Sequence, residues 1–261
     1  MSDVEPILIR RIEDGVATLI LNRPEARNAL SVALMTELET ALADIKTDRS
    51  VKVVVLAANG PAFCAGHDLK EMRGLQGAEA VAAVFALCSR VMTAVVRLPQ
   101  PVIAKVHAMA TAAGCQLVAS CDLAYAAESA RFATPGVNIG LFCSTPMVAL
   151  SRAVGRKHAM EMLLSGQPAD ACSAAAWGLI NRAVPAAELD GAVAEMAAAI
   201  AAKSAYTVKV GKEAFYRQIE MGLDDAYAYA SRVMTENMLA ADAAEGIDAF
   251  LSKRAPVWRG C

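Results

Sequence analysis

The sequence has little excess charge of either sign, and this absence excludes one class of protein. Its 25 Lys and Arg residues nearly balance 27 Asp and Glu residues, so the net charge is −2. A nucleic-acid-binding protein would need a basic face that releases counterions. The low hydrophobicity of a disordered chain is also absent, because 56% of the 261 residues are hydrophobic. We therefore expect a folded protein with a substantial core, in one large domain or two small ones.

The sequence also lacks the even number of cysteines that is typical of a disulfide scaffold. The odd number and the mostly apolar surroundings are typical of buried free thiols and predict a reducing compartment. Met1–Glu5 carries two acids and no basic stretch, and no apolar run precedes a small-residue cleavage site. We therefore expect no targeting segment and a cytoplasmic protein. The seven cysteines are Cys64, Cys88, Cys115, Cys121, Cys143, Cys172 and Cys261.

A membrane-spanning segment is not expected either. One uncharged stretch, Phe132–Ser151, has the necessary length, but it contains two prolines, two glycines and an asparagine. These residues would break a spanning helix twice in hydrocarbon. The stretch instead predicts a buried loop followed by the start of a helix.

Strands alternate with helices in the first half of the chain. The tripeptide Glu13-Asp14-Gly15 separates two short apolar runs and predicts a hairpin. Ser31 is positioned to cap a helix with apolar residues at helical intervals, and residues 78–97 predict another helix. Strands separated by helices imply crossover connections and stacked sheets. The predicted strands are residues 7–12, 16–21, 51–57, 101–106 and 121–126.

From about Pro146 onward the chain is rich in alanine and reads as helical. Pro185 and Glu188 open a long predicted helix that runs through Ile200, and no low-complexity linker divides the two halves. The helical C-terminal part is therefore a small second domain or a layer that packs on a neighbour. Close packing of alanine-rich helices suits an oligomer interface. Further predicted helices cover residues 205–219, 223–239 and 243–253.

Three segments, taken together and in order, carry a resemblance to a known family. Residues 22–24 (NRP) and 28–30 (NAL) stand between a predicted strand and a helix. Residues 62–72 (AFCAGHDLKEM) follow the next strand, and residues 112–117 (AAGCQL) precede 120–124 (SCDLA). Their order and spacing resemble the crotonase superfamily, the enoyl-CoA hydratases and isomerases, across essentially the whole chain.

The resemblance implies an α/β fold, a crotonase-type spiral of ββα units with a helical C-terminal trimerisation part. The spiral core with its acyl-CoA site would cover residues 1–200, and the helical oligomerisation part residues 201–261. The implied partners are a coenzyme A thioester as substrate and further copies of the chain, in a homotrimer or hexamer. No cofactor and no metal are implied.

The resemblance also implies an oxyanion hole, a pair of backbone N–H groups that hold the thioester oxygen. By position these are the amides of His67 and Ala113. Gly66 and Gly114 beside them allow a ligand to approach the backbone, and the second donor stands where a helix begins. Two donors aimed at an enolate oxygen supply the largest catalytic effect in many such sites. The ring of His67 either acts as a general base or merely lines the pocket.

The positions of the two catalytic glutamates depart from the hydratase pattern. The resemblance places Gln116 at one position and Gly136 at the other, and neither can exchange a proton. Because acid–base catalysis contributes ~10²–10⁴-fold per group, we do not expect efficient hydration. Residues 110–122, 132–146 and 250–258 are similar to the subgroup called enoyl-CoA hydratase domain-containing protein 3, whose name does not establish a reaction.

Several other residues are candidates for binding the substrate, each with a plainer alternative. Asp68 could cap the helix that follows it, and Asn138 could hold a turn. Lys70 and Lys253 could neutralise coenzyme A phosphates, with Lys253 from a neighbouring subunit, or could be solvated surface. The full set of substrate-binding candidates is Ala65, Asp68, Leu69, Lys70, Gly114, Asn138, Cys143, Phe250 and Lys253, with Arg254 beside them.

A few residues have mainly structural interpretations. Ser144 or Thr145 is expected to cap a helix ahead of Pro146, because proline is favoured at a first helical position. Cys115 and Cys121 are expected to be small core residues. His107 and His158 have no partner visible in the sequence and are interpreted as structural.

The leading hypothesis for function is an acyl-CoA enzyme of hydratase/isomerase type, a lyase or isomerase of acyl-CoA and fatty acid metabolism that stabilises a thioester enolate. One alternative is a non-catalytic acyl-CoA binder or regulator that kept the site and lost the acid–base pair. Another is a different crotonase reaction, isomerisation or thioester hydrolysis, that uses a carboxylate elsewhere or a bound bicarbonate.

Overall fold

Two sheets organise the first two thirds of the chain in the computed structural model, which describes residues 5–261. The larger sheet has the strand order β1-β2-β3-β5-β7-β10 and the smaller has β4-β6-β8-β9. The β1–β2 and β8–β9 pairs are antiparallel and the other pairs are parallel. The strands are β1 (Leu8–Glu13), β2 (Val16–Leu21), β3 (Val53–Ala58), β4 (Ala62–Cys64), β5 (Val102–Val106), β6 (Met109–Thr111), β7 (Leu123–Ala127), β8 (Arg131–Ala133), β9 (Ala169–Asp170) and β10 (Arg182–Val184).

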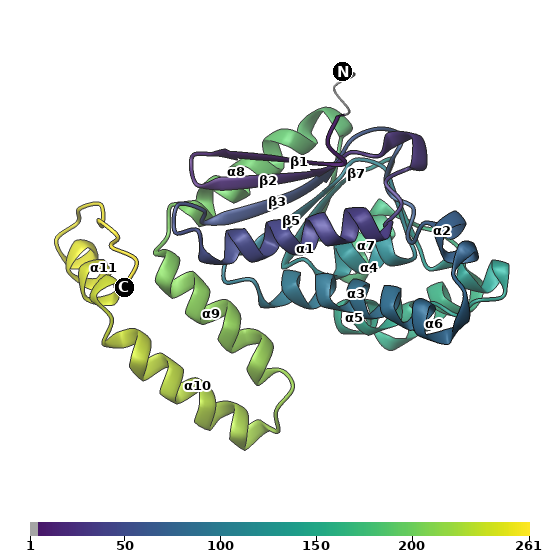
Figure 1. The fold of residues 1–261 in the computed structure, drawn as a ribbon. Helices are drawn as coiled ribbons and strands as arrows, with labels where there is room; N and C mark the ends of the chain where they lie inside the picture. The colour runs from purple at the N-terminus through teal and green to yellow at the C-terminus, as the bar shows by residue number, and fades with distance from the viewer. Residues whose placement is uncertain (1–4) are drawn as a thin grey trace.

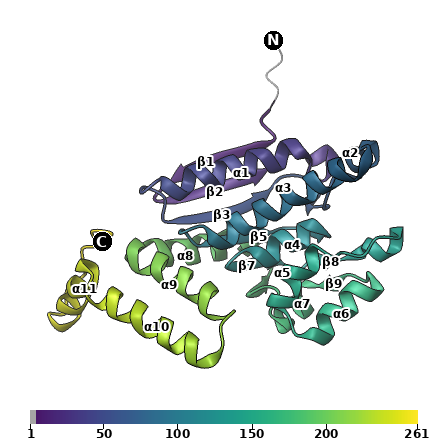
Figure 2. The same cartoon turned by 60° about the horizontal axis from the view of Figure 1, so that its bottom comes forward.

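The chain repeats one unit, in which a strand of the larger sheet leads to a strand of the smaller sheet and then to a helix. β3 and β4 lead to α2 (Leu69–Gly74) and α3 (Gly77–Arg97), and β5 and β6 lead to α4 (Ala113–Ser120). β7 and β8 lead through the 3-10 helix η2 (Pro135–Ile139) to α5 (Pro146–Ala153). Figures 1 and 2 show these units following one another along the molecule. The predicted α/β spiral of ββα units is confirmed.

Local sequence explains the first long helix. α1 (Val32–Thr47) begins where the Ser31 hydroxyl accepts a hydrogen bond from the Leu34 N–H, at 3.2 Å. Its buried residues include Leu38 and Ile45, which recur on one face. A side-chain cap and an apolar stripe together fix the start and the orientation of a helix.

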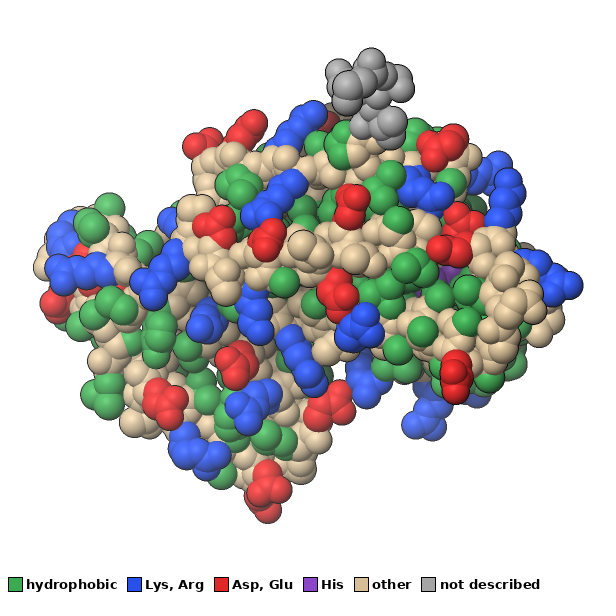
Figure 3. Space-filling view, viewed as in Figure 1, with side chains coloured by type: hydrophobic (Ala, Val, Ile, Leu, Met, Phe, Trp, Pro, Cys, Tyr) green, Lys and Arg blue, Asp and Glu red, His purple; other side chains and the backbone are tan. Residues whose placement is uncertain are grey.

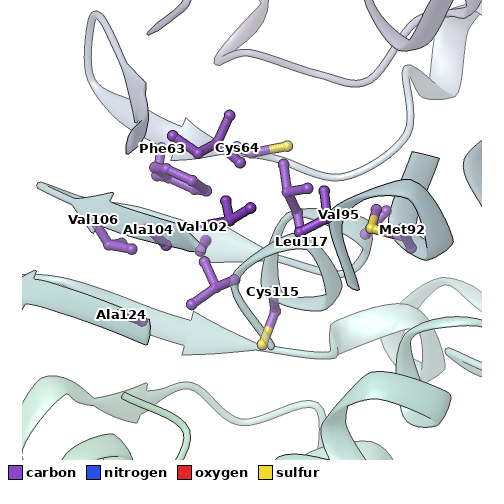
Figure 4. Packing of buried hydrophobic residues seen from close by; sticks show 14 of the residues in the cluster. Phe63, Cys64, Met92, Val95, Val102, Ala104, Val106, Cys115, Leu117 and Ala124 are labelled. Carbon is purple, nitrogen blue, oxygen red and sulfur yellow. The ribbon is translucent and has the colours of Figure 1, made fainter. Parts of the chain in front are cut away.

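The larger sheet is covered on both faces, which explains the uninterrupted apolar sequence of β3. Val54 and Leu56 of β3 belong to the main core, whose packing between strands and helices is shown in Figure 4. Val53 and Val55 face the opposite way and pack against α8 (Leu189–Ala201). A strand buried on both faces needs apolar side chains at every position rather than at alternate ones.

Smaller elements complete the core, and two of the predictions in this region need correction. The predicted helix from Pro185 begins as a separate 3-10 turn, η3 (Ala186–Glu188), before α8. Neither Ser144 nor Thr145 caps α5, because Thr145 makes no capping hydrogen bond and the Ser144 hydroxyl donates to the Phe142 carbonyl instead. The remaining elements are η1 (Pro24–Ala26), α6 (Arg156–Ser165) and α7 (Ala171–Trp177).

Among residues 5–261, one helix, α3, has the length and apolarity of a membrane span, and a third of its apolar window is buried. The buried residues of α3 lie at helical intervals and include Val84, Val91 and Val95, all in the main core. This is the pattern of a core helix. The stretch that the sequence analysis considered, 132–151, forms the end of β8, η2, a loop and most of α5. The helix start agrees with the prediction, but the loop is exposed rather than buried, with Leu141 58% and Phe142 43% exposed.

The cysteines are free thiols, as predicted. Five of the seven are buried or half-buried, and Cys172 and Cys261 are exposed. Burial raises the pKa of the Cys64 and Cys115 thiols to about 12, so both are protonated and unreactive. Residues 1–4, on which the prediction of no targeting segment depends, lie outside the described residues.

Three helices at the C-terminus, with the tail that follows them, extend away from the spiral. We call residues 205–261 the C-terminal arm; it comprises α9 (Ala205–Gln218), α10 (Leu223–Met238) and α11 (Ala241–Leu251). Figures 1 and 2 both show the arm projecting from the core at the end opposite α2. No residue of α9 or α10 is fully buried. The predicted boundary at 200 and 201 falls in the last turn of α8.

A buried ion pair fastens the arm to the core. The Lys212 ammonium on α9 donates to Asp122 Oδ2 at 2.6 Å and to the Val95 and Gln100 carbonyl oxygens. The Tyr216 hydroxyl donates to Asp122 Oδ1 at 3.0 Å. Because the Lys212 side chain is only 7% exposed, this contact is shielded from solvent. This contact fixes α9 against the core.

Candidate active site

The segment before α1 holds the loop that follows β4. The buried side-chain amide of Asn28 donates to the Asn59 and Ala62 carbonyl oxygens, at 2.7 and 2.8 Å, and its Oδ1 accepts from the Arg23 N–H. The Arg23 guanidinium donates to Asp68 Oδ2 at 3.1 Å. The first sequence motif therefore acts as a brace for the second. Its contribution to the site is position, not chemistry.

Two glycines bring the two predicted oxyanion segments into contact. A Cβ atom at Gly66 would lie 2.9 Å from the Ala112 Cβ and 3.4 Å from the Ala113 nitrogen. A Cβ atom at Gly114 would lie 2.2 Å from the Cys64 carbonyl oxygen. Only residues without a side chain permit such an approach. The loop after β4 and the start of α4 are thus packed backbone to backbone, which brings together the two loops expected to form an oxyanion hole.

The two predicted donors are free. Among residues 5–261, neither the His67 N–H nor the Ala113 N–H donates a hydrogen bond to another protein group. Ala113 is the first residue of α4, where the helix leaves its N–H groups unpaired and carries a partial positive charge. Ala112 before it has φ 49° and ψ −118°, an unusual conformation for a residue with a side chain. Strain of this kind accumulates where a backbone group must be held in one direction.

Buried polar atoms without partners gather in the same three segments. Of the five described residues that have such atoms, His67 follows β4, Gln116 lies on α4 and Thr134 follows β8. The Ala112 N–H donates to the Ala133 carbonyl at 2.9 Å, so Thr134 lies next to the start of α4. Buried polar groups are normally paired, and a cluster of exceptions indicates a place where a polar ligand or water binds. The sequence analysis missed Thr134, whose signal was a polar residue directly after a strand and before a proline.

Gly136 stands at the second of the two positions where the hydratase pattern has a glutamate, and its surroundings explain why no carboxylate is present there. A Cβ atom there would lie 2.6 Å from the Leu141 carbonyl oxygen and 2.9 Å from the Cys143 sulfur. Its φ is not positive, so the constraint is this close approach and not the backbone conformation. Burial raises the pKa of Cys143 above its ordinary value, so its thiol is protonated. The loop 141–143 occupies the space that a side chain at position 136 would need.

The residues after His67 form the start of α2. The Asp68 carboxylate accepts from the Lys70 and Glu71 N–H groups, so the predicted capping role is confirmed. Burial tends to raise the pKa of Asp68, but hydrogen bonds from Arg23 and these amides lower it overall. Leu69 and Lys70 are exposed beside the site. The Ala65 N–H donates to the Arg27 carbonyl, which fixes the loop from its other end.

Other candidates lie away from the two donors. The exposed Asn138 packs against Gly166 at the end of α6, in agreement with a structural role. Phe250, 83% exposed, and Lys253 belong to the C-terminal arm, at the opposite end of the molecule from α2 (Figure 1). Arg254 is paired with Glu245 at 2.6 Å. Within one chain, the arm contributes nothing to the site.

Two histidines outside the site have the structural surroundings that the sequence analysis expected. The His158 ring stacks on Trp177 with centroids 4.4 Å apart, and His107 Nε2 lies 2.8 Å from the Gly60 carbonyl oxygen. Among residues 5–261, no group of three or more His, Cys, Asp or Glu side chains is arranged to hold a metal ion.

Comparisons with known proteins agree with the fold and the motifs. The model of a family described as Enoyl-CoA hydratase/isomerase matches residues 11–261. Enoyl-CoA hydratase domain-containing protein 3, mitochondrial, of Homo sapiens is 47% identical over 257 residues, which cover 98% of this chain and 84% of that protein. The crystal structure of the human protein superposes with a TM-score of 0.95, covering 97% of this chain and 100% of that chain. An enoyl-CoA hydratase from Mycobacterium smegmatis superposes with a TM-score of 0.95 at 55% identity, covering 97% and 99%.

The comparisons confirm the predicted resemblance to the domain-containing protein 3 subgroup and correct one prediction. A cytoplasmic location is wrong on this evidence, because the relatives from rat, mouse and human are all named as mitochondrial. The prediction relied on reduced cysteines and on the composition of the first five residues. Free thiols are a property of the folded chain and do not distinguish one reducing compartment from another.

Proposed function

Because the chain belongs to the enoyl-CoA hydratase/isomerase family, we propose that it binds acyl-CoA thioesters and stabilises their enolates. The thioester oxygen accepts hydrogen bonds from the His67 and Ala113 N–H groups. The single observation that supports this assignment is the pair of unpaired donors, held in adjacent segments by Gly66 and Gly114. Preorganised donors of this kind stabilise negative charge on an oxygen without reorganisation.

Hydration of the double bond is not the reaction we assign. Gln116 cannot carry a proton, and Gly136 has no side chain and no room for one. The losses of two acid–base groups, each worth ~10²–10⁴-fold, leave the oxyanion hole as the one part of the hydratase machinery that this site keeps. We expect crotonyl-CoA to be hydrated very slowly. The second candidate is a non-catalytic acyl-CoA binder, and isomerisation and thioester hydrolysis are the alternative reactions of the same enolate-stabilising site.

Replacing Ala113 with proline tests the oxyanion assignment. Proline is accepted at the first position of a helix, but it removes the N–H and places its Cδ where the thioester oxygen would lie. We expect binding of butyryl-CoA, followed by calorimetry, to weaken at least tenfold in Ala113→Pro. The matched control is Ala205→Pro, at the exposed first position of α9 after Ser204, whose φ of −57° and ψ of 118° suit a residue before proline. Equal affinities in a folded Ala113→Pro and the control would refute the assignment.

We also propose that the protein is a homo-oligomer built on trimers, as a trimer or a hexamer. Large apolar side chains are exposed along α9 and α10, among them Phe215, Tyr227, Met234 and Leu239. Figure 3 shows hydrophobic side chains on the surface of this part of the molecule. A patch of this extent is unusual on a monomer. In such an assembly Phe250 and Lys253 would be available to the site of a neighbouring copy. Sedimentation at micromolar concentration that gives only a 27.3 kDa species would refute the proposal.

A further inference from the structure

The imidazole ring of His67 is an anomaly within the site. Both of its ring nitrogens are buried, and neither has a hydrogen-bond partner. The ring lies edge-on to Phe85 of α3, with centroids 5.4 Å apart and planes at 89°. A histidine kept only for packing would be replaceable by an apolar residue without leaving two polar atoms unpaired. The ring therefore needs an explanation that its packing does not supply.

The other titratable groups of these segments are occupied or protonated. The Asp68 carboxylate is bound by Arg23 and by two amides of α2. The Glu71 carboxylate accepts from the Val32 N–H at 2.9 Å. The thiols of Cys64 and Cys143 have raised pKa values and carry a proton at neutral pH. Among these groups, the His67 ring alone combines unpaired atoms with the capacity to accept a proton near pH 7.

Covalent geometry limits the distance between this ring and the carbon that would react. A thioester oxygen bound to the His67 N–H lies ~2.9 Å from that nitrogen. The α-carbon of the acyl group is two bonds from that oxygen, about 2.4 Å away. The ring nitrogen nearer the backbone lies roughly 3–4 Å from the same N–H, since it is separated by bonds of about 1.5 Å. The ring nitrogen therefore lies at most about 9 Å from the α-carbon, and rotation about the His67 side-chain bonds determines how much closer it comes.

We propose that the neutral His67 imidazole is the base that removes the α-proton of the bound acyl-CoA. This inference rests on the proposed function. The ring nitrogen takes the proton, the C–H electron pair forms the double bond of the enolate, and the carbonyl π pair moves to the oxygen held by the two N–H groups. The imidazolium then returns a proton to the α-carbon. The step needs no co-reactant, and it replaces the missing glutamates by a group attached to the oxyanion hole itself.

The surroundings of the ring determine the pH dependence. Burial lowers the pKa of His67, while the Leu30 carbonyl, which is near the ring but not in hydrogen-bond geometry with it, and the negative charge of Glu71 on α2 partly oppose that shift. α3 presents the uncharged Phe85. The net direction is downward, so the ring is neutral and active at pH 7. The rate should fall as the pH drops through a midpoint below the ordinary histidine value of about 6.5.

The test is exchange of the α-protons of butyryl-CoA in deuterated water, followed by mass spectrometry. It reports enolate formation directly and does not require a glutamate. We expect the wild-type protein to exchange, and both His67→Ala and His67→Gln to exchange at least 100-fold more slowly at saturating butyryl-CoA. Both variants keep the backbone N–H, so binding by calorimetry should change less than threefold. The matched control is His158→Phe, which removes the other histidine with an unpaired buried nitrogen while keeping a ring on Trp177.

The outcomes separate this proposal from the one on which it rests. No binding of butyryl-CoA by the wild type overturns the proposed function. Binding without exchange at any pH from 5 to 8 overturns the base and leaves the binding assignment in place. Wild-type exchange rates in His67→Ala or His67→Gln, or a wild-type rate that does not fall at low pH, also overturn it. A loss of exchange confined to the His67 variants, with binding kept, supports it.

Discussion

Position 136 allows a sharp test of the packing that excludes a carboxylate. In Gly136→Ala the new Cβ would meet the Leu141 carbonyl oxygen at 2.6 Å and the Cys143 sulfur at 2.9 Å. Overpacking typically costs about 1–3 kcal/mol, and contact with backbone rather than with a mobile side chain favours the upper end. The reduced entropy of the unfolded chain returns about 0.4–1 kcal/mol. We therefore expect a net loss of about 2 kcal/mol in the free energy of unfolding.

The matched control is Gly191→Ala on α8. Gly191 lies in an exposed helical position, its φ is not positive, and a Cβ there would meet nothing within 4 Å. Alanine should stabilise this helix by about 0.5–1 kcal/mol. The two variants make the same chemical change, so most of the difference of about 3 kcal/mol reports local packing. Denaturant titrations at one fixed protein concentration measure it, because assembly shifts apparent stability.

The functional counterpart is Gln116→Glu combined with Gly136→Glu. Because the side chain at 136 cannot enter without displacing loop 141–143, we expect no rise in crotonyl-CoA hydration in a folded double variant. A Gly136→Ala variant as stable as the wild type, or a double variant with brisk hydratase activity, would refute the packing argument. A brisk wild-type hydratase would refute the assignment of the two positions.

Three further outcomes are expected. Asn28→Ala leaves two carbonyl groups unpaired and puts alanine at φ 54°. The free energy of unfolding, measured by denaturant titration, should therefore fall by about 3 kcal/mol. Lys212→Met leaves Asp122, whose side chain is 15% exposed, without its cation, at a cost of about 3 kcal/mol, and should make the C-terminal arm sensitive to limited proteolysis. Burial tends to raise the pKa of Asp242, but hydrogen bonds from Ser204 and the tail amides lower it overall. The stability that the Asp242 carboxylate contributes is therefore full above the unfolded carboxyl pKa of about 4 and is lost as pH falls through the lower folded pKa. The fluorescence of Trp258 should follow this loss in the wild type and not in Asp242→Asn.

The elements that the sequence predicted well are those in which local and global signals agree. α1 has a capping serine, helical spacing of apolar residues and a core to pack against, and its start was predicted at Ser31. β3 has an unbroken apolar run because both faces of its sheet are covered. The hairpin predicted from Glu13-Asp14-Gly15 depends on residues within one turn, where Asp14 and Gly15 both have positive φ. These are short-range determinants that a single sequence displays.

The parts of the site that escaped prediction depend on contacts between distant segments. Gln116 and Gly136 were identified through the resemblance, but the contact of Gly136 with loop 141–143 is a tertiary feature. Thr134 was not singled out, because its unpaired hydroxyl is visible only once β8 lies beside the start of α4. The predicted cap of α5 is wrong for a related reason, since the Ser144 hydroxyl donates to the Phe142 carbonyl instead. Residue types limit what a side chain can do, and packing decides which of those options it takes.

The two departures from the hydratase pattern differ in how they could be reversed. Gln116 is buried on α4 and has the size of a glutamate, so a carboxylate there would need only a hydrogen-bond donor for its unpaired Oε1 position. Gly136 is different, because the course of loop 141–143 is built on the absence of its side chain. A chain that carries a glutamate at this position must route the following loop elsewhere. The glycine and the loop are therefore one structural unit, and the chemistry available to this site has to come from groups outside it.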